Sequence, residues 1–280
     1  MDRLRFGTAG IPLSTLREKT VNTVNGIRRV RELGLENMEI EFVRQVFIKE
    51  SAAHLVKEAA KKQDVALTCH GQYFINLNAV ERETVLASMQ RIAYAAKIAS
   101  LCGAESLTFH AAYYLNQDKE RVYERVKDSL KEVIRQLQDA GHQIWIRPET
   151  TGKPTQWGDL KEILKLSQEL EQVLPCIDFS HLHARSGGKN NTYEEFRQML
   201  VEVEKAKGRE ALNNMHIHVS GINYTAKGER NHLDLKESDL NYQDLIRAWK
   251  EFKIKGVVIS ESPNIEGDAL LMQKEWNKKE

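Results

Sequence analysis

A carboxylate and an imidazole stand three residues apart at the end of a short apolar segment. Asp178 and His181 follow residues 173–177, which read Val-Leu-Pro-Cys-Ile. A buried strand that ends in Asp-x-x-His presents an oxygen ligand and a nitrogen ligand at one mouth, a combination that suits Zn²⁺ or Mn²⁺. Asp and Ser are also ordinary caps of a following helix, so this motif is a weak signal when taken alone.

The same order, a strand followed by a histidine or a carboxylate, recurs along the chain. Taken singly, such a histidine is more often a hydrogen-bonded rim residue, and such a glutamate is more often in a salt bridge. Six strands that end in this way are hard to explain by chance, and most steps between them are about 30 to 43 residues. His54 and His142 fall inside or after expected helices and are predicted to be structural. The residues predicted to meet in a metal site are His70, His110, Glu149, Asp178, His181, His216, His218 and Glu261.

The mixture of imidazoles and carboxylates favours Zn²⁺, Mn²⁺ or Fe²⁺ over Mg²⁺ or Ca²⁺. The candidate ligands outnumber the three or four that one catalytic zinc takes, so a cluster of two or three ions that share a bridging carboxylate is expected. Such clusters, with ions about 3.5–4 Å apart, serve phosphoester hydrolysis by activating a hydroxide and stabilising the leaving oxygen.

The elements that must position these residues alternate between short apolar runs and amphipathic helices. Alternation with nearly all-apolar strands indicates a parallel sheet covered by helices, and eight repeats are the count of a closed (β/α)₈ barrel. An open doubly wound sheet is the main rival, but no glycine fingerprint follows the first strand. The chain is therefore predicted to be one α/β TIM barrel domain spanning residues 1–280. The expected strands are 4–9, 38–43, 65–69, 106–109, 143–147, 173–177, 214–219 and 257–260, and the expected helices are 20–33, 52–62, 81–101, 119–140, 159–170, 193–206, 242–252 and 267–276.

Composition narrows the class of protein. The net charge is only +1, so a nucleic-acid partner requires a local basic patch rather than bulk charge. The three cysteines, Cys69, Cys102 and Cys176, are isolated, which fits a reducing compartment. The charged N-terminus lacks a signal peptide's apolar stretch, and no run reaches the length of a membrane helix. We expect a cytoplasmic monomer without a membrane partner.

Several of these segments resemble the endonuclease IV family of apurinic/apyrimidinic endonucleases, a branch of the xylose-isomerase-like barrels. The most specific piece is residues 70–77, His-Gly-Gln-Tyr-Phe-Ile-Asn-Leu, which resembles the family's His-x-x-Tyr-x-Ile-Asn-Leu. Residues 108–110 resemble its Phe-His strand end, and residues 149–152 resemble Glu-Asn-Thr-Ala-Gly imperfectly. Residues 177–181 match Ile-Asp-Thr-x-His, and residues 261–263 resemble Glu-Thr-Pro. The resemblance spans nearly the whole chain.

The resemblance implies zinc ligands and a reaction. A first zinc is implied at His70, His110 and Glu149. Glu149 bridges to a second, completed by Asp178, a histidine of the seventh strand and Glu261, while His181 and His232 hold a third. Glu149 and Glu261 are thus the candidate catalytic residues, with two or three Zn²⁺ ions, or Mn²⁺, as cofactors. The implied reaction is hydrolysis of the phosphodiester 5′ to an abasic site in double-stranded DNA.

Three departures from the family pattern bear on the site. The seventh strand reads His-Ile-His-Val-Ser, in which both histidines point the same way; His218 overlays the family's ligand better than His216. The family's Asp-x-His at the third zinc is replaced by Glu-Arg-Asn-His, which leaves Glu229 one residue out of register with that carboxylate. The second strand, residues 38–42, looks more like the sugar-isomerase relatives. The rival function is therefore a sugar isomerase or epimerase with one metal ion on strands five to eight. A barrel that binds metal and grips damaged DNA without catalysis is a third possibility.

Candidate contacts to DNA come from loops beyond the strand ends. Tyr73 matches a position that the family inserts into DNA, and Arg44 is a candidate for another. Arg185 and Lys189 flank paired glycines after the sixth strand, and Arg230 lies in the loop after the seventh. The alternative for these loops is a solvated, flexible segment.

Overall fold

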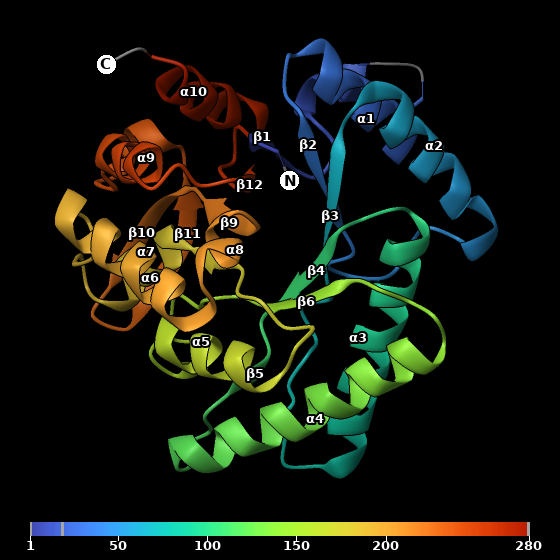
Figure 1. Cartoon of the computed structure of the whole chain (residues 1–280), viewed down its shortest axis with the longest axis vertical. Coiled ribbons are helices and arrows are strands. Elements are labelled where there is room, and N and C mark those ends of the chain that lie inside the picture. Colours follow the sequence, from blue (N-terminus) through green and yellow to red (C-terminus); the bar gives the residue numbers. More distant parts are fainter. Residues whose placement is uncertain (1, 18–19, 279–280) are drawn as a thin grey trace.

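Eight parallel strands follow one another around a barrel in the computed structural model, which describes residues 2–17 and 20–278 (Figure 1). Consecutive strands are hydrogen-bonded neighbours, and the last pairs with the first, with Leu4 opposite Gly256 and Thr8 opposite Ser260. In order around the barrel, the strands are β1 (Leu4–Ala9), β2 (Asn37–Glu41), β3 (Ala66–His70), β4 (Ser106–Phe109), β6 (Trp145–Pro148), β8 (Ile177–Asp178), β9 (Met215–Val219) and β12 (Gly256–Ser260).

The barrel closes between β6 and β8 through a looser seam. Single parallel bridges join Ile146 to Val173 and Glu149 to Cys176. Backbone hydrogen bonds from Cys176 to the Pro148 carbonyl (3.1 Å) and from Thr150 to the Cys176 carbonyl (3.0 Å) complete the seam. The predicted (β/α)₈ barrel is therefore confirmed, with strand boundaries within a few residues of those expected.

Helices surround the barrel because each presents one apolar stripe to the strands. In α4, buried Val122, Val126, Leu130, Val133 and Leu137 recur at helical spacing. Capping boxes start two of the helices, Asp159 with Glu162 before α5 and Thr192 with Glu195 before α7. The helices are α1 (Thr23–Glu32), α2 (Ala53–Gln63), α3 (Arg82–Leu101), α4 (Lys119–Asp139), α5 (Leu160–Glu169), α6 (Phe179–Arg185), α7 (Tyr193–Lys207), α8 (Arg209–Leu212), α9 (Tyr242–Glu251) and α10 (Glu266–Trp276).

The segment between β9 and α9 is not the long polar loop that the sequence suggests. It contains an antiparallel hairpin of β10 (Gly221–Thr225) and β11 (Gly228–Leu233). A second small pair, β5 (Ala112–Tyr113) with β7 (Gln156–Trp157), links the loops that follow β4 and β6. Both pairs lie beyond the carboxyl ends of the strands and shape the mouth of the barrel at that end.

The inward face of the barrel is polar. Strand registers place Glu39 opposite Thr68, Thr108 opposite Arg147 and Asp178 opposite His218, all facing the interior. Barrels of this type are usually filled with bulky branched residues. In this barrel, polar side chains also occupy the interior beneath the mouth. The apolar core that stabilises the fold lies between the strands and the surrounding helices.

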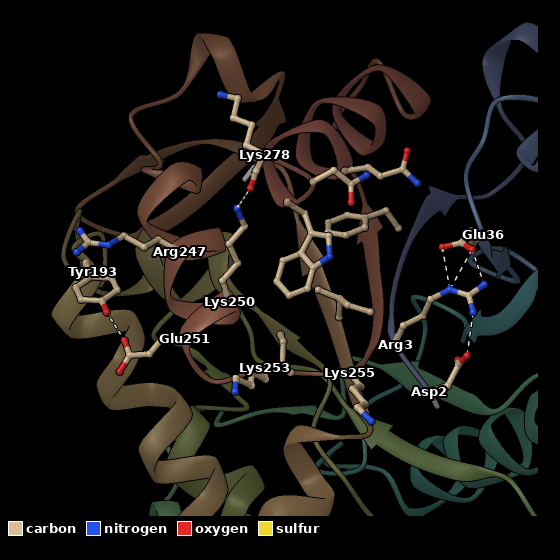
Figure 2. Close-up of a pocket in the computed structure, with 16 residues that line it drawn as sticks. Asp2, Arg3, Glu36, Tyr193, Arg247, Lys250, Glu251, Lys253, Lys255 and Lys278 are labelled. Atoms are coloured by element: carbon tan, nitrogen blue, oxygen red, sulfur yellow. Dashed lines mark hydrogen bonds and ion pairs between the residues drawn. The ribbon is translucent and has the colours of Figure 1, made fainter. Parts of the chain in front are cut away.

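A cavity of about 890 Å³ lies at the amino-terminal end of the barrel, between the starts of β1 and β12 and the helices α9 and α10. Lysines line it, among them Lys250, Lys253 and Lys255 (Figure 2). Within the described residues, no helix is both long and apolar enough to cross a membrane.

Candidate metal centre

Glu149 stands at the centre of the carboxyl-terminal mouth, just beyond the end of β6. Its side chain is buried, and its two oxygens face different histidines. His70 Nε2 lies 3.3 Å from Oε2, whereas His110 Nε2 and His181 Nδ1 lie 3.3 Å and 3.0 Å from Oε1. Three strand ends far apart in the sequence thus converge on one carboxylate, as the barrel topology predicts.

A first group of possible ligands lies on one side of Glu149. Its ligand atoms, one from each of Glu149, Asp178, His218 and Glu261, all lie within 4.8 Å of one another. His218 Nδ1 is 3.2 Å from Glu261 Oε1 and 3.6 Å from Glu149 Oε1. This set holds the four ligands expected for the bridged ion, and it places His218 rather than His216 at the mouth.

A second group lies on the other side of Glu149 and differs in detail from the expected first zinc set. His110, Glu149 and His181 have ligand atoms within 4.8 Å of one another. His70 approaches the opposite oxygen of the carboxylate instead, and its ring centroid is 6.3 Å from that of His110. The two histidines of β3 and β4 therefore flank Glu149.

A third group joins the hairpin to α6. The ligand atoms of this group, from His181, Glu229 and His232, also lie within 4.8 Å of one another. His181 Nε2 is 3.4 Å from His232 Nε2. By sequence spacing, Glu229 lies one residue away from the position at which the family pattern has its carboxylate. A bulge in the hairpin corrects this offset. Tyr224 pairs with Glu229 and Asn223 with Asn231, so Arg230 is the extra residue, and Glu229 returns to the face that carries His232.

The electrostatics of the mouth are dominated by buried carboxylates. Burial raises the pKa of Asp178 to about 7, with the Glu261 and Glu149 carboxylates adding to the rise. Burial likewise raises the pKa of Glu41 to about 8. Burial also favours the neutral form of Glu149, but the His110 and His218 imidazoles outweigh it and hold the pKa of that carboxyl well below its usual range. Bound cations would offset the repulsion among these buried carboxylates and favour their charged forms.

The donor set fits a cluster of Zn²⁺ or Mn²⁺ ions. Both oxygens of Glu149, Oδ2 of Asp178 and both ring nitrogens of His218 are buried without a hydrogen-bond partner among the described residues. Buried polar atoms are normally paired, so atoms that approach one another yet form no hydrogen bond are what a metal site leaves. Imidazole and carboxylate ligands are the ones these metals prefer.

Neighbouring carbonyls fix the orientation of two of the histidines. His70 Nδ1 lies 2.7 Å from the Gly71 carbonyl, and His181 Nδ1 lies 3.0 Å from the Thr150 carbonyl. A ring N–H that donates to a carbonyl leaves the other nitrogen free as a ligand, the arrangement typical of metal-binding histidines. Nε2 of His70 then faces Glu149, and Nε2 of His181 faces the hairpin.

Two other histidines lie outside the three ligand groups of the mouth and contact other parts of the fold. His216 lies deeper in the barrel, where Nδ1 is 3.0 Å from Ser106 Oγ and Nε2 is 2.9 Å from Glu39. His183 is buried, with contacts to the Lys189 carbonyl (2.8 Å) and to Asp239 (3.1 Å), so it ties α6 to the loops around it.

Sequence reasoning missed two acidic residues and set a third aside. Glu39 and Glu41 line the interior from β2, and Glu229 joins the third group from the hairpin. The signal for the first two was present, since two glutamates that alternate within a buried strand must share its inward face. Glu229 was set aside as out of register, because the bulge that corrects its register depends on how two strands pair and not on spacing within one of them.

The candidate DNA contacts fall into two classes. Tyr73 is 66% exposed and meets the His70 ring edge-on with centroids 5.9 Å apart, while Arg44, Lys189 and Arg230 are exposed at the same end. Arg185 differs from this expectation: its Nη1 donates to the carbonyls of Lys153 (2.5 Å) and Gln156 (3.0 Å), among other acceptors. Its guanidinium therefore holds the loop after β6, and its Nη1 is occupied by the acceptors of that loop.

Comparison with known proteins places the chain in a family. The sequence profile described as "Xylose isomerase-like TIM barrel" matches residues 27–279. The chain belongs to this family. It is 46% identical over 275 residues to an uncharacterized protein of Methanocaldococcus jannaschii, covering 98% of this chain and 97% of that protein. It is 22% identical over 217 residues to a probable endonuclease 4 of Mycoplasma pneumoniae, covering 75% and 73%.

Solved structures share the family's barrel across different activities. Endonuclease IV of Thermus thermophilus superposes with a TM-score of 0.70 at 18% identity, over 98% of both chains. A D-tagatose 3-epimerase-like protein superposes with a TM-score of 0.71 at 16% identity, over 95% of this chain and 94% of the other. At these identities the likeness establishes the fold, and the function must be argued from the site.

Proposed function

We propose that this protein is a metal-dependent phosphodiesterase of the endonuclease IV type, which hydrolyses double-stranded DNA 5′ to abasic sites. The observation that carries the proposal is the position of His70 and His110, each with Nε2 3.3 Å from one oxygen of Glu149. One-metal chemistry needs only the ligands from strands β6 to β12. Two further histidines on the same carboxylate provide for a second ion, which phosphodiester hydrolysis uses.

The side chains around Glu149 would hold the ions, and His70 joins the first set through Oε2 of Glu149 although it lies outside the second group described above. His70, His110 and Glu149 would hold one; Glu149, Asp178, His218 and Glu261 a second; and His181, Glu229 and His232 a third. Zn²⁺ bound there supplies a Lewis acid that activates water and stabilises charge on phosphate oxygens. The chain's own contribution is to keep the ligand atoms together in a buried, polar mouth before substrate arrives.

The surface around the mouth suits a DNA duplex that lacks one base. Tyr73 and Phe74 are 66% and 65% exposed, and Phe47 is 51% exposed on the loop after β2. Exposed aromatic rings can stack on bases and fill the space that a missing base leaves. Arg44, Lys189 and Arg230 supply charge for phosphates at the same end, although the whole chain carries a net charge of only +1.

A second candidate function has its own support. The group of Glu149, Asp178, His218 and Glu261 satisfies one Mn²⁺ or Zn²⁺ ion by itself, and the chain shares its fold with a D-tagatose 3-epimerase-like protein. Proton transfer beside a sugar carbonyl needs that ion alone. In that function, His70 and His110 would hydrogen-bond the sugar.

The variant His70→Ala/His110→Ala separates the two functions. Under the nuclease proposal it loses about one metal ion per chain by elemental analysis, and its incision of an abasic duplex is abolished. His54→Ala is the matched control, because His54 is exposed on α2 and belongs to none of the three ligand groups; it keeps both metal and activity. Unchanged metal content in the double variant, together with ketose epimerisation or isomerisation by the parent protein, would replace the nuclease with the sugar enzyme.

A further inference from the structure

A glutamate of β2 lies beneath the mouth, inside the barrel, against two histidines of β9. Strands β1 and β12 separate β2 from β9 in the sheet, so the contact crosses the barrel interior. One carboxylate oxygen of Glu39 is 2.9 Å from Nε2 of His216, and the other is 2.8 Å from Nε2 of His218. All three side chains are at most 1% exposed. A single buried carboxylate therefore contacts two imidazole rings away from water.

The arginine of the barrel interior is directed elsewhere. The guanidinium of Arg147 donates to the carbonyls of Pro175 (2.9 Å) and Asn214 (2.9 Å). A buried charge is costly unless it is paired, and the partners that the structure gives to Glu39 are the two imidazoles. The carboxylate and the two rings thus depend on one another.

The short distances indicate which ring nitrogens carry protons. A nitrogen that turned its lone pair toward a carboxylate oxygen 2.8–2.9 Å away would be repelled, because both atoms would be acceptors. Each Nε2 therefore carries a ring proton. Neither contact has the direction of a hydrogen bond among the described residues, so the carboxylate holds the rings by charge. His216 agrees with this assignment, because its Nδ1 lies 3.0 Å from Ser106 Oγ and can accept from that hydroxyl.

A proton on Nε2 of His218 leaves its Nδ1 free for a metal ion. Nδ1 is the nitrogen that faces the mouth, 3.2 Å from Glu261 Oε1 and 3.6 Å from Glu149 Oε1. A histidine that binds a metal through one nitrogen normally gives its other N–H to a carboxylate or a carbonyl, which fixes the ring and makes it a stronger ligand. His70 has a carbonyl in that place, whereas His218 has the carboxylate of Glu39.

We propose that Glu39 is a positioning residue of the metal centre, whose carboxylate holds His218 in the tautomer and orientation that present Nδ1 to the mouth. Glu39 belongs to none of the groups of possible ligands, so it acts through His218 and does not bind the ion. This role rests on the proposed function, because it needs an ion held by Glu149, Asp178, His218 and Glu261. The epimerase alternative uses the same ion and would give Glu39 the same role.

The tautomer of His218 can be measured in the parent protein. The protein is labelled at its histidine nitrogens and loaded with Zn²⁺, and long-range proton–nitrogen NMR correlations identify the protonated and the metal-bound nitrogen of each ring. We expect a proton on Nε2 of His218 and zinc on Nδ1, with His218→Ala assigning the signals. This measurement does not depend on the folding of any variant at Glu39. Zinc on Nε2 of His218, or a proton on Nδ1, overturns the proposal.

The variant Glu39→Gln tests the role by its effect on metal affinity. The amide keeps the size of the side chain and removes its charge. Competition with a chelator should show binding weakened by about 10- to 100-fold for the ion that His218→Ala loses. Thr68→Val is the matched control, because buried Thr68 pairs with Glu39 across β2 and β3 and its hydroxyl has no hydrogen-bond partner among the described residues. It should keep the parental affinity; equal weakening in both variants would show a general effect of packing and overturn the role.

The outcomes separate this role from the proposed function. Weaker zinc binding in Glu39→Gln alone, with no incision of an abasic duplex by the parent protein, leaves the positioning role standing while the nuclease fails. Incision by the parent protein, together with parental zinc affinity in Glu39→Gln, removes the positioning role and leaves the nuclease.

Discussion

The two ends of the barrel hold their charged side chains in different ways. At the amino-terminal end, a cavity of about 890 Å³ is lined by lysines, arginines and acids at the surface, and several of these charged groups are paired (Figure 2). Arg3 meets Glu36 at 2.6 Å, and Lys250 donates to the Lys278 carbonyl at 2.8 Å. At the carboxyl-terminal end, Glu149, Asp178 and His218 are almost wholly buried, and several of their polar atoms have no hydrogen-bond partner among the described residues.

The difference shows that open volume is a poor guide to chemistry in this molecule. Surface ion pairs in water contribute little energy and are easily rearranged. Buried ligand atoms held close together without hydrogen bonds are costly to maintain, and they persist because a ligand compensates for them. The carboxyl-terminal mouth is therefore the end where substitutions should abolish activity, and the amino-terminal cavity is the control.

The largest expected effect is that of Glu149→Gln. The amide keeps the shape of the side chain but removes the charge that two groups of ligands share, so incision of an abasic duplex should fall by about a thousandfold or more, which is several kcal/mol of lost transition-state stabilisation. The matched substitution at the other end, Glu36→Gln, should leave incision unchanged. Near-parental cleavage by Glu149→Gln would show that this buried carboxylate matters no more to activity than a surface carboxylate at the amino-terminal end.

Most of this architecture could be predicted from the sequence. Apolar runs and amphipathic helices repeat at regular intervals, and a parallel barrel brings every strand end to one mouth, so His70, His110, Glu149 and Asp178 could be placed together without a structure. Periodicity carries this information because it follows from local geometry.

What the sequence did not predict depends on contacts between distant segments. The bulge at Arg230, which brings Glu229 onto the face of His232, arises from the pairing of two strands. The internal bonds of Arg185 depend on how the loop after β6 folds back on α6. A cation in a glycine-rich segment looks the same in sequence whether it faces a phosphate or a carbonyl.

A smaller effect is expected where the hairpin meets the mouth. The Glu229 amide donates to the Gly152 carbonyl at 2.9 Å, and a Cβ built on Gly152 would lie 2.6 Å from Glu229 Cβ and 3.1 Å from His181. Gly152→Ala should therefore push the hairpin away, separate Glu229 from His181, and weaken the third ion's binding by about 10- to 100-fold, as loss of supporting contacts around metal ligands does.

Metal content and incision of Gly152→Ala should be compared with those of Gly34→Ala, after α1. An added methyl at Gly34 meets nothing within 4 Å, and its positive φ of 78° makes the substitution a control for general destabilisation away from the mouth. Glu229→Gln removes the ligand without moving the hairpin and should lose the same ion. If both Gly152→Ala and Glu229→Gln keep the full metal content, the hairpin contributes no ligand and the third group is only a polar cluster.

The smallest expected effect concerns DNA affinity. It compares exposed cationic side chains beside the mouth with those at the amino-terminal end of the barrel. Lys189 and Arg230 are exposed beside the mouth, whereas Lys250 and Lys253 line the amino-terminal cavity. Each phosphate contact releases counterions, so Lys189→Gln/Arg230→Gln should weaken duplex binding and reduce the slope of log affinity against log salt by about 1 per residue. Lys250→Gln/Lys253→Gln should leave the slope unchanged. Arg185→Gln should also leave it unchanged, because that guanidinium is occupied by carbonyls of the loop after β6. Equal flattening by the lysine pair of the amino-terminal cavity would show that DNA does not distinguish the two ends, and the assignment of the mouth as the DNA-binding surface would fail.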